Sequence, residues 1–189
     1  MNDPGLPPDS YCAHAVGHPF HGPYHDNEYG FPLRDDDALF GRLLLEINQA
    51  GLSWLTILKK RESLRGAYDG FRIAAVAAYE EADRDRLLAD PGIIRNRLKV
   101  EAAIHNARRI LDLKEEFGSF AAWLDDHHPS SKAVWVELFN AHFKFTGGEI
   151  TGEFLLSTGY LPGAHHPACP IYAAVVAARP PWTRIQADS

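Results

Sequence analysis

The chain has 189 residues, of which 46% are hydrophobic and 23% are charged, and its formal net charge at pH 7 is −6. This length and hydrophobic content suffice for one domain, or for two small lobes that share a cleft. The sequence has no apolar run long enough to span a bilayer, and its opening, MNDPGLPPDS, lacks the basic and apolar regions of a signal peptide. We therefore expect a cytoplasmic protein without a membrane partner.

The N-terminal part of the chain is rich in histidine and interrupted by helix breakers. Residues 1–10 are predicted to form a tail. Residues 11–30 contain four histidines, which are His14, His18, His21 and His25. Two glycines and two prolines fall between His14 and His25, and an interior proline costs a helix about 3 kcal/mol while a glycine costs about 1 kcal/mol. We predict an irregular segment, whose histidines are either solvated loop residues or metal ligands.

The two cysteines of the chain, Cys12 and Cys169, lie near its opposite ends. A disulfide between them is disfavoured in a reducing compartment, and two isolated buried thiols are the ordinary alternative. Cys169 follows His165 by four residues, and His25 lies near Cys12 in sequence. Together these four residues have the donor types of a tetrahedral Cys₂His₂ zinc site. The residue types alone leave both alternatives open.

The rest of the chain is predicted to be nearly all helix. Residues 35–54, DDDALFGRLLLEINQAGLSW, begin with acidic residues suited to a helix N-terminus and continue with an apolar stripe. Further helices are predicted at residues 53–67, 73–77, 82–89, 97–117, 119–127, 131–142 and 148–157. Alternating runs joined by hairpin turns are missing from the sequence, so the predicted fold class is all-α. Residues 173–189 are predicted to form a C-terminal tail.

The segment LLADPGIIRNRLK contains a turn that matters for the ligand class. A helix is predicted to end at about Asp90, Pro91 and Gly92 to form a tight turn, and a second helix to begin at about Arg95. In such a helix-hairpin-helix, amide groups at the start of the second helix can hold a phosphate. Nearby positive charge comes from Arg95, Arg97 and Lys99. An ordinary helical connection with a hydrated basic face is the alternative.

Glu46 lies within an apolar stretch, LLLEINQAGLSW. A carboxylate in an apolar wall is unfavourable unless it has partners or a ligand. The alternative is a position on the polar edge of the helix. With the aromatic residues Tyr24, Tyr29 and Trp54, Glu46 would suit a pocket that stacks a flat ring and binds its edge.

Segments of the chain resemble, in order and spacing, the 3-methyladenine DNA glycosylase I family of the helix-hairpin-helix DNA glycosylase superfamily: YHDNEYG, LEINQAGLSWLTILKKRESLRGAY, DPGIIRNRLKVEAAIHNA, FKFTGG and HHPAC. The resemblance covers residues 11–172. It implies a helix-hairpin-helix glycosylase domain of two helical lobes, with a structural zinc ion joining the N- and C-terminal segments. The implied zinc ligands are Cys12, His25, His165 and Cys169, and His166 is an alternative to His165.

The resemblance also implies an activity, which is hydrolytic removal of N3-alkylated adenine from duplex DNA by a monomer. The free 3-methyladenine base leaves, and an abasic site remains without a covalent lysine intermediate. Alkylation makes the base cationic, so aromatic faces and a carboxylate can bind the flipped base. By resemblance Glu46 is the catalytic residue. The implied base-pocket residues are Tyr24, Tyr29, Trp54, His14, His21 and Asn48. The implied DNA-binding residues are Gly92, Ile93, Ile94, Arg95, Arg97 and Lys99.

Some positions depart from the pattern of the family. His14 stands where the family has a tryptophan, His21 replaces a tyrosine, and Tyr29 replaces the tryptophan of an EWG motif. Ile47 and Asn48 follow Glu46. A protonated histidine repels a cationic base, so the two histidines need to be neutral or to point away.

These departures leave two alternatives to removal of 3-methyladenine. The chain could be a non-catalytic binder of alkylated DNA or of a modified purine, or a glycosylase for a different alkylated purine. Many helix-hairpin-helix glycosylases also use an aspartate after the hairpin, and Asp112 stands at a suitable distance. Because the family that the chain resembles does not use that residue, we expect Asp112 to be a surface acid.

Overall fold

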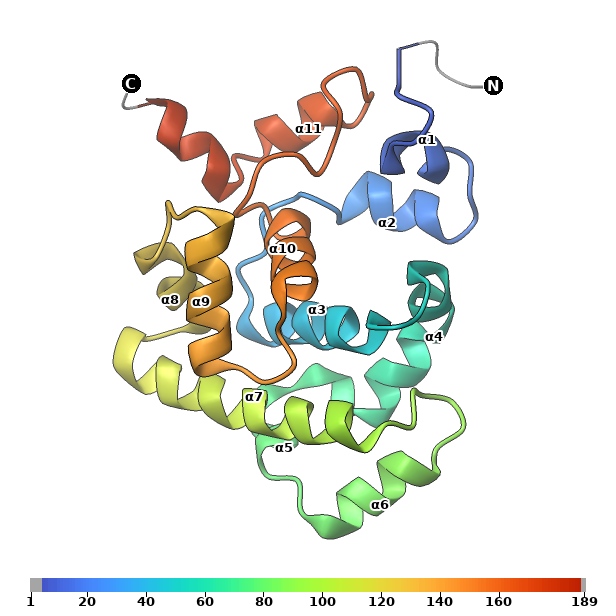
Figure 1. Cartoon of the computed structure of the whole chain (residues 1–189), viewed down its shortest axis with the longest axis vertical. Helices are drawn as coiled ribbons and strands as arrows, with labels where there is room; N and C mark the ends of the chain where they lie inside the picture. Colours follow the sequence, from blue (N-terminus) through green and yellow to red (C-terminus); the bar gives the residue numbers. More distant parts are fainter. Residues whose placement is uncertain (1–4, 188–189) are drawn as a thin grey trace. The chain divides into compact units, whose positions relative to one another are not determined.

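The computed structural model describes residues 5–187, and every regular element within that range is a helix (Figure 1). This confirms the predicted all-α fold class. The elements are α1 (Tyr11–Ala15), α2 (His21–Asn27), α3 (Asp36–Gln49), α4 (Trp54–Ala67), η1 (Asp69–Phe71), α5 (Ile73–Ala77), α6 (Glu81–Ala89), α7 (Arg97–Phe117), α8 (Phe120–Asp126), α9 (Lys132–His142), α10 (Gly148–Ser157), α11 (Tyr172–Ala177) and η2 (Pro181–Ala187). Residues 1–4 and 188–189 of the predicted tails lie outside the described range. None of the helices described has both the length and the apolar character needed to cross a membrane.

The chain divides into two compact units. The first unit combines the N-terminal segment up to Leu33 with the C-terminal segment from Leu155 onward, and the second unit is Arg34–Phe154. The second unit is therefore continuous in sequence, whereas the first is built from the two ends of the chain. Helix α10 crosses the boundary between them.

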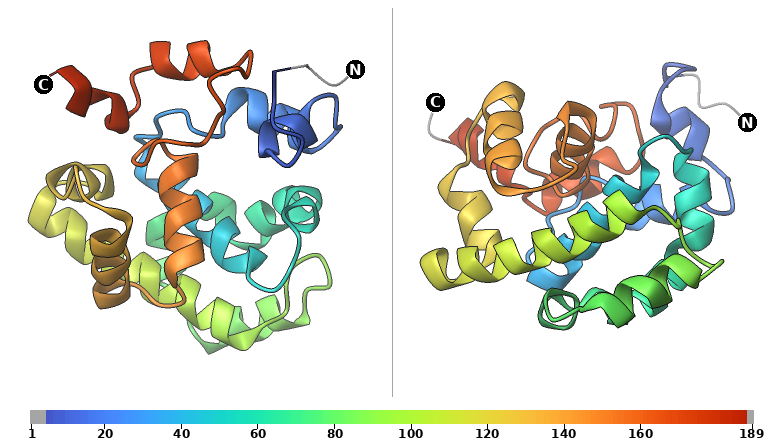
Figure 2. Two further views of the ribbon diagram at one scale, coloured as in Figure 1. Left: turned by 45° about the horizontal axis from the view of Figure 1, so that its top comes forward. Right: turned by 60° about the horizontal axis from the view of Figure 1, so that its bottom comes forward.

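The second unit is organised around α7, which packs against α3, α5, α6 and α8. Figure 2 shows α7 running beside these helices in both views. Aromatic side chains fill the core between α8, α9 and α10: the ring centroids of Trp123 and Phe139 are 5.7 Å apart, and those of Phe139 and Phe154 are 5.5 Å apart. Such pairs add about 0.5–1.5 kcal/mol each to the effect of burial alone.

Side-chain caps explain where the helices of the second unit begin. The carboxylate of Asp35 accepts a hydrogen bond from the Ala38 amide at 2.9 Å at the start of α3. Ser53 caps α4 and Asn96 caps α7 in the same way. Each cap satisfies an amide that the helix leaves unpaired and is worth about 1 kcal/mol. The predicted helices between residues 35 and 157 are therefore confirmed to within a few residues.

The prediction of an irregular segment over residues 11–30 was wrong, because α1 and α2 lie within it. The break between them falls at residues 16–20, which include one glycine and one proline. Pro23 lies in the first turn of α2, where a helix leaves its amide groups unpaired and the missing N–H of proline costs nothing. His18 compensates further, because its Nδ1 accepts hydrogen bonds from the amides of Phe20 and His21, both at 3.1 Å.

The C-terminal segment, predicted as a tail, contains α11 and η2. Val175 of α11 is buried, and the Trp182 amide donates to the Gly159 carbonyl oxygen at 3.1 Å. These contacts lie within the first unit. Residues 172–184 therefore pack as an ordered part of that unit.

Candidate functional site

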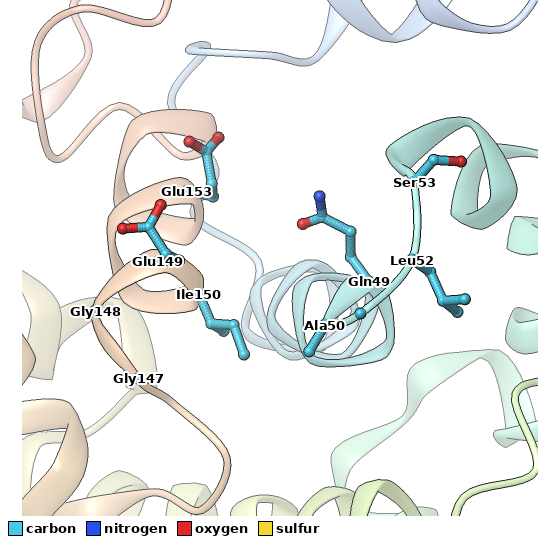
Figure 3. Close-up of a pocket in the computed structure, with 10 residues that line it drawn as sticks. Gln49, Ala50, Leu52, Ser53, Gly147, Gly148, Glu149, Ile150 and Glu153 are labelled. Carbon is cyan, nitrogen blue, oxygen red and sulfur yellow. The ribbon is translucent and has the colours of Figure 1, made fainter.

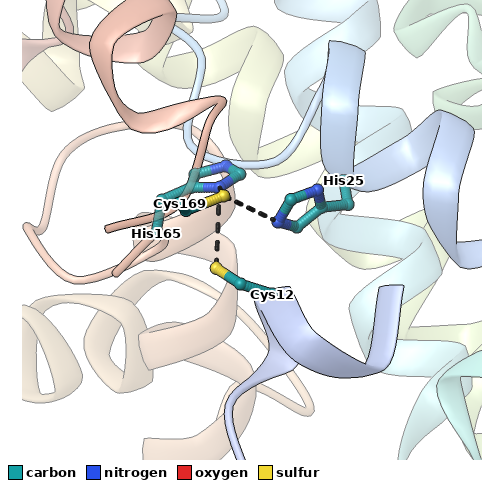
Figure 4. Close-up of side chains that lie close together, drawn as sticks. All are labelled: Cys12, His25, His165 and Cys169. Atoms are coloured by element: carbon teal, nitrogen blue, oxygen red, sulfur yellow. Dashed lines mark hydrogen bonds between the residues drawn. The ribbon is translucent and has the colours of Figure 1, made fainter. Parts of the chain in front are cut away.

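Two cysteines and two histidines converge in the first unit (Figure 4). Cys12 lies on α1 and His25 on α2, while His165 and Cys169 follow α10. All four side chains are buried, and one donor atom of each lies within 4.8 Å of the others. The structure thus brings together the four residues predicted as zinc ligands.

The distances within the cluster fit a tetrahedral zinc ion. The Sγ of Cys169 is 3.7 Å from both His25 Nε2 and His165 Nδ1, and the Sγ of Cys12 is 3.9 Å from His165 Nδ1. Zinc–sulfur and zinc–nitrogen bonds of about 2.3 and 2.0 Å at tetrahedral angles place sulfur and nitrogen about 3.5 Å apart. The donor atoms are therefore already near the separations that one ion requires.

The outer nitrogen of each cluster imidazole has a hydrogen-bond acceptor. His25 Nδ1 is 2.7 Å from a carboxylate oxygen of Asp26, and His165 Nε2 is 2.7 Å from the carbonyl oxygen of Tyr29. Because each outer nitrogen donates its proton, the inner nitrogen presents a lone pair to the cluster. Burial also lowers the pKa of His165, which favours the neutral imidazole that a metal ligand needs.

His166 was the predicted alternative to His165, but its imidazole is not part of the cluster. Its ring Nδ1 accepts a hydrogen bond from the Ala168 amide at 3.2 Å. The backbone amide of His166 instead donates to the Sγ of Cys12 at 3.4 Å. Such a bond favours a thiolate, so His166 supports the cluster through its backbone.

The predicted base-pocket residues of the first unit form an aromatic group. Tyr24 and Tyr29 are buried with ring centroids 5.7 Å apart, and the rings of His14 and His21 are 4.7 Å apart. The hydroxyl of Tyr11 is 3.1 Å from His21 Nδ1. Burial lowers the pKa of His21, and the neighbouring histidines lower it further. His21 is therefore neutral at neutral pH, which removes the repulsion that a protonated ring would exert on a cationic base.

Glu46 lies in the second unit, on the buried face of α3, with only 3% of its surface exposed. The alternative position on the polar edge of the helix is excluded. Desolvation raises the pKa of Glu46 to about 8, while the charge of Arg42 lowers it and that of Glu153 raises it. A carboxyl group with this pKa is largely protonated at pH 7, and an approaching cation favours its ionisation.

Asn48 and Trp54 are the other predicted base-pocket residues of the second unit. Asn48 lies in the last turn of α3, and Trp54 lies at the start of α4. The amide of Asn48 donates to the Leu44 carbonyl oxygen at 2.8 Å, whereas its buried Oδ1 has no hydrogen-bond partner among the described residues. Trp54 is the first residue of α4 and is partly buried. The unpaired Oδ1 of Asn48 can accept a hydrogen bond from a ligand.

The turn between α6 (Glu81–Ala89) and α7 (Arg97–Phe117) lies where the sequence predicts it. The Gly92 amide donates to the Asp90 carboxylate at 2.7 Å, and a Cβ at position 92 would lie only 2.9 Å from that carboxylate. A larger residue at this position would therefore displace the Asp90 carboxylate that accepts the hydrogen bond. The ammonium group of Lys60 donates to the carbonyl oxygens of Pro91 and Gly92 at 3.3 and 3.0 Å, which fixes α4 against the turn.

The predicted DNA-binding residues around this turn differ in exposure. Arg95 and Arg97 are exposed and Ile94 is partly exposed, whereas Ile93 is buried. Arg97 also lies 3.9 Å from the carboxylate of Glu81, in an exposed ion pair. Ile93 anchors the turn in the core instead of presenting its side chain to DNA.

Lys99, which was predicted to bind DNA, is buried in the second unit. Its side chain is 4% exposed, and its Nζ donates to the carbonyl oxygens of Asn48 and Ala50 at 2.9 and 2.7 Å. These carbonyl groups lie at the C-terminal end of α3, where a helix has unpaired acceptors and a negative dipole end. Lys99 therefore stabilises the end of the helix that carries Glu46.

Asp112 is a surface acid, as expected. Its side chain is 65% exposed and lies 3.4 Å from the guanidinium of Arg109, one turn earlier on α7. An exposed ion pair of this kind contributes less than about 1 kcal/mol.

A cavity of about 740 Å³ in the second unit was not predicted (Figure 3). It is lined by residues 49–53, between α3 and α4, and by residues 147–150 and Glu153, at the start of α10. Figure 3 shows Glu149 and Glu153 on one side and Gln49 on the other. On the side formed by α10, the sequence signal for the cavity is the glycine pair of the FKFTGG motif, Gly147 and Gly148.

Comparisons with known proteins agree over most of the chain. A sequence profile of the methyladenine glycosylase family matches residues 14–134. DNA-3-methyladenine glycosylase 1 of Escherichia coli (strain K12) is 37% identical over 180 residues, which are 85% of this chain and 96% of that protein. The structure of 3-methyladenine DNA glycosylase I from Staphylococcus aureus has a TM-score of 0.77 at 33% identity, covering 85% of this chain and 95% of that one. A tyrosine-to-phenylalanine variant of a 3-methyladenine DNA glycosylase I in complex with 3-methyladenine has a TM-score of 0.75 at 33% identity, covering 85% of this chain and 96% of that one.

Proposed function

The chain belongs to the methyladenine glycosylase family, and on that premise we propose that it is a DNA repair glycosylase that removes 3-methyladenine from duplex DNA. The observation that carries this proposal is the buried carboxyl group of Glu46 in a chain so similar to these glycosylases. Burial of an ionisable group is unfavourable for folding, so its presence is best explained by a ligand that interacts with it. A cationic purine is such a ligand.

The chemical step needs little acid catalysis, because the alkylated base is already a good leaving group. The bond between the sugar C1′ and N9 of the base breaks, and its electron pair neutralises the positive ring. A water oxygen bonds to C1′, a proton is released, and an abasic site remains. Glu46 binds the edge of the flipped base, and its ionisation is favoured by the positive charge of that base. Trp54, which lies in the same unit as Glu46, provides an aromatic face.

We further propose the helix-hairpin-helix glycosylase fold, with the α6–α7 turn as the hairpin. The exposed Arg95 and Arg97 and the amides at the start of α7 would bind the phosphate backbone. Such contacts give affinity with little sequence preference, as repair of scattered lesions requires.

A structural zinc ion is the third part of the proposal. Cys12, His25, His165 and Cys169 would hold it, and four protein ligands leave no coordination position for water. The ion would tie the N-terminal and C-terminal segments of the first unit together and would supply folding free energy there.

The test is to incubate the protein with methylated duplex DNA and to identify the released bases by chromatography. We expect 3-methyladenine to be released, and Glu46→Gln to lower its rate of release about 100-fold while the variant stays folded. Asp112→Asn, which removes an exposed acid, is the matched control and is expected to be unchanged.

Other outcomes separate the alternatives. Release of a different alkylated purine would assign another substrate to the same site, and it would fit the histidines at positions 14 and 21. Binding of alkylated DNA by a folded protein that releases no base would contradict the enzymatic function and would favour the non-catalytic binder.

A further inference from the structure

Phe145, in the loop between α9 and α10, has an unusual conformation. Its φ is +64°, in the left-handed region that a bulky residue rarely adopts, and 36% of its side chain is exposed. Neither the backbone strain nor the exposed ring favours folding. A conformation of this kind persists only where the surrounding structure imposes it.

Buried hydrogen bonds impose the conformation of this loop. The side chain of the fully buried Asn106 accepts from the Lys144 amide at 2.8 Å and donates to the Lys144 carbonyl oxygen at 3.0 Å. The hydroxyl of Thr146 donates to backbone carbonyl oxygens at 3.2 and 3.3 Å, and the hydroxyl of Thr151 donates to the Thr146 carbonyl oxygen at 2.9 Å. Phe145 is thus held on both sides, and its exposed ring is part of a rigid loop.

The ring of Phe145 lies beside the cavity of the second unit. The ammonium group of Lys99 is 5.9 Å from the ring centroid and 2.7 Å from the carbonyl oxygen of Ala50, which lines the cavity. Gly147, two residues after Phe145, lines the cavity as well. Phe145 therefore lies near this cavity, within the unit that carries Glu46, and is linked to the cavity wall through Lys99.

We propose that Phe145 is a DNA-contacting residue that stacks on a base next to the extruded nucleotide. This inference rests on the proposed function, because extrusion of a nucleotide exposes the faces of neighbouring bases. An aromatic side chain held rigidly at the protein surface can replace the lost stacking. The ring itself carries no charge, so the contact that it offers is with the face of a base rather than with a phosphate.

The test measures the affinity of Phe145 variants for a fluorescently labelled duplex that contains a tetrahydrofuran abasic-site analogue. Glycine adopts a φ of +64° without strain, which offsets part of the packing lost with the ring, so Phe145→Gly is expected to fold. We expect Phe145→Gly to weaken duplex binding about tenfold and Phe145→Tyr to keep the wild-type affinity, because tyrosine retains the stacking face. Val134→Ala, which truncates another exposed apolar side chain, is the matched control and is expected to leave the affinity unchanged.

The dependence of affinity on salt separates stacking from charge. Phe145→Gly is expected to weaken binding equally at all salt concentrations, whereas Arg97→Ala is expected to reduce the salt slope by about one. Equal affinities of wild type and Phe145→Gly, or a changed salt slope in that variant, would overturn the proposal.

Excision assays distinguish this proposal from the proposed function. Wild-type excision with unchanged affinity of Phe145→Gly would refute the contact and leave the glycosylase intact. The reverse result, a wild type that excises no base but a variant that binds the duplex more weakly, would refute the glycosylase and support the contact.

Discussion

The Cys/His cluster of the first unit and Glu46 of the second are both buried polar groups. They differ in whether the surrounding protein satisfies their polar atoms. Each imidazole of the cluster has an acceptor for its outer nitrogen, and the four donor atoms converge within 4.8 Å. Glu46 is instead held at a raised pKa by burial. We expect the cluster to stabilise the fold through the proposed zinc ion, whereas the buried carboxyl group of Glu46 lowers stability in the absence of a ligand.

The largest expected effect concerns the cluster. Cys169→Ser should lower the free energy of unfolding by at least about 5 kcal/mol, because it would remove one ligand of the proposed zinc ion. Thermal unfolding with and without a chelator checks this, since the wild type should lose stability on chelation and the variant should not. His166→Ala, outside the cluster, is the control and should behave as the wild type does. A metal-free wild type with unchanged melting after chelation would refute the zinc site.

The next effect concerns the contribution of Glu46 to the stability of the protein as the pH changes. Its pKa is raised from 4.5 in the unfolded chain to about 8 in the folded protein, so unfolding releases a proton within this window. Stability should therefore be greatest below pH 4.5 and fall by about 1.4 kcal/mol per pH unit toward pH 8, relative to Glu46→Gln. Denaturant unfolding of both proteins across this range measures the difference. If the unfolding free energies of the two proteins changed in parallel with pH, the pKa of Glu46 would not be raised in the folded protein. The contrast between Glu46 and the Cys/His cluster would then be refuted.

The rate of base excision should also depend on pH through the ionisation of Glu46. If the ionised carboxylate binds the base, kcat/KM should rise about tenfold per pH unit below pH 8 and then level off. The residual activity of Glu46→Gln should lack this rise. A wild-type profile that is flat between pH 6 and 9 would indicate that the rate does not depend on ionisation of Glu46.

The smallest effects compare a buried cation with an exposed one. Lys99→Met should lower stability by about 2 kcal/mol, because two carbonyl groups at the end of α3 lose a charged donor. Arg97→Ala should leave stability unchanged and weaken DNA binding a few fold. Unfolding and DNA-binding measurements on both variants check the assignment, and a DNA-specific loss in a fully stable Lys99→Met would restore Lys99 to the DNA-binding surface.

Sequence patterns predicted the helices of the second unit well, because local signals there agree. Amphipathic stripes are preceded by capping residues such as Asp35 and Ser53, so both the helices and their starting points were predictable. The short helices α1 and α2 were missed because a proline inside a predicted span was treated as a helix breaker. Pro23 is tolerated because it falls in the first turn, and the sequence does not show where a five- or seven-residue helix begins.

For the candidate site, residue types indicated the Cys/His cluster and Glu46 as candidates but left alternatives open, and the resemblance to the family assigned their roles. Cysteines, histidines and a glutamate in an apolar run are conspicuous in any sequence. The burial of Lys99 was not predicted, because Lys99 contacts the end of α3, which lies about 50 residues away in the chain and meets it only in the folded unit. The cavity wall at residues 147–153 was missed for the same reason, because its opposite side comes from residues 49–53.

The discontinuous first unit imposes an order on biosynthesis. The second unit, Arg34–Phe154, can begin to fold as soon as its last helix leaves the ribosome. Cys12 is synthesised early but can meet Cys169 only after the C-terminal segment has been synthesised. The contacts within the Cys/His cluster therefore form late. A nascent chain that stops short of residue 169 therefore carries Glu46 and the hairpin but lacks the Cys/His closure of its first unit.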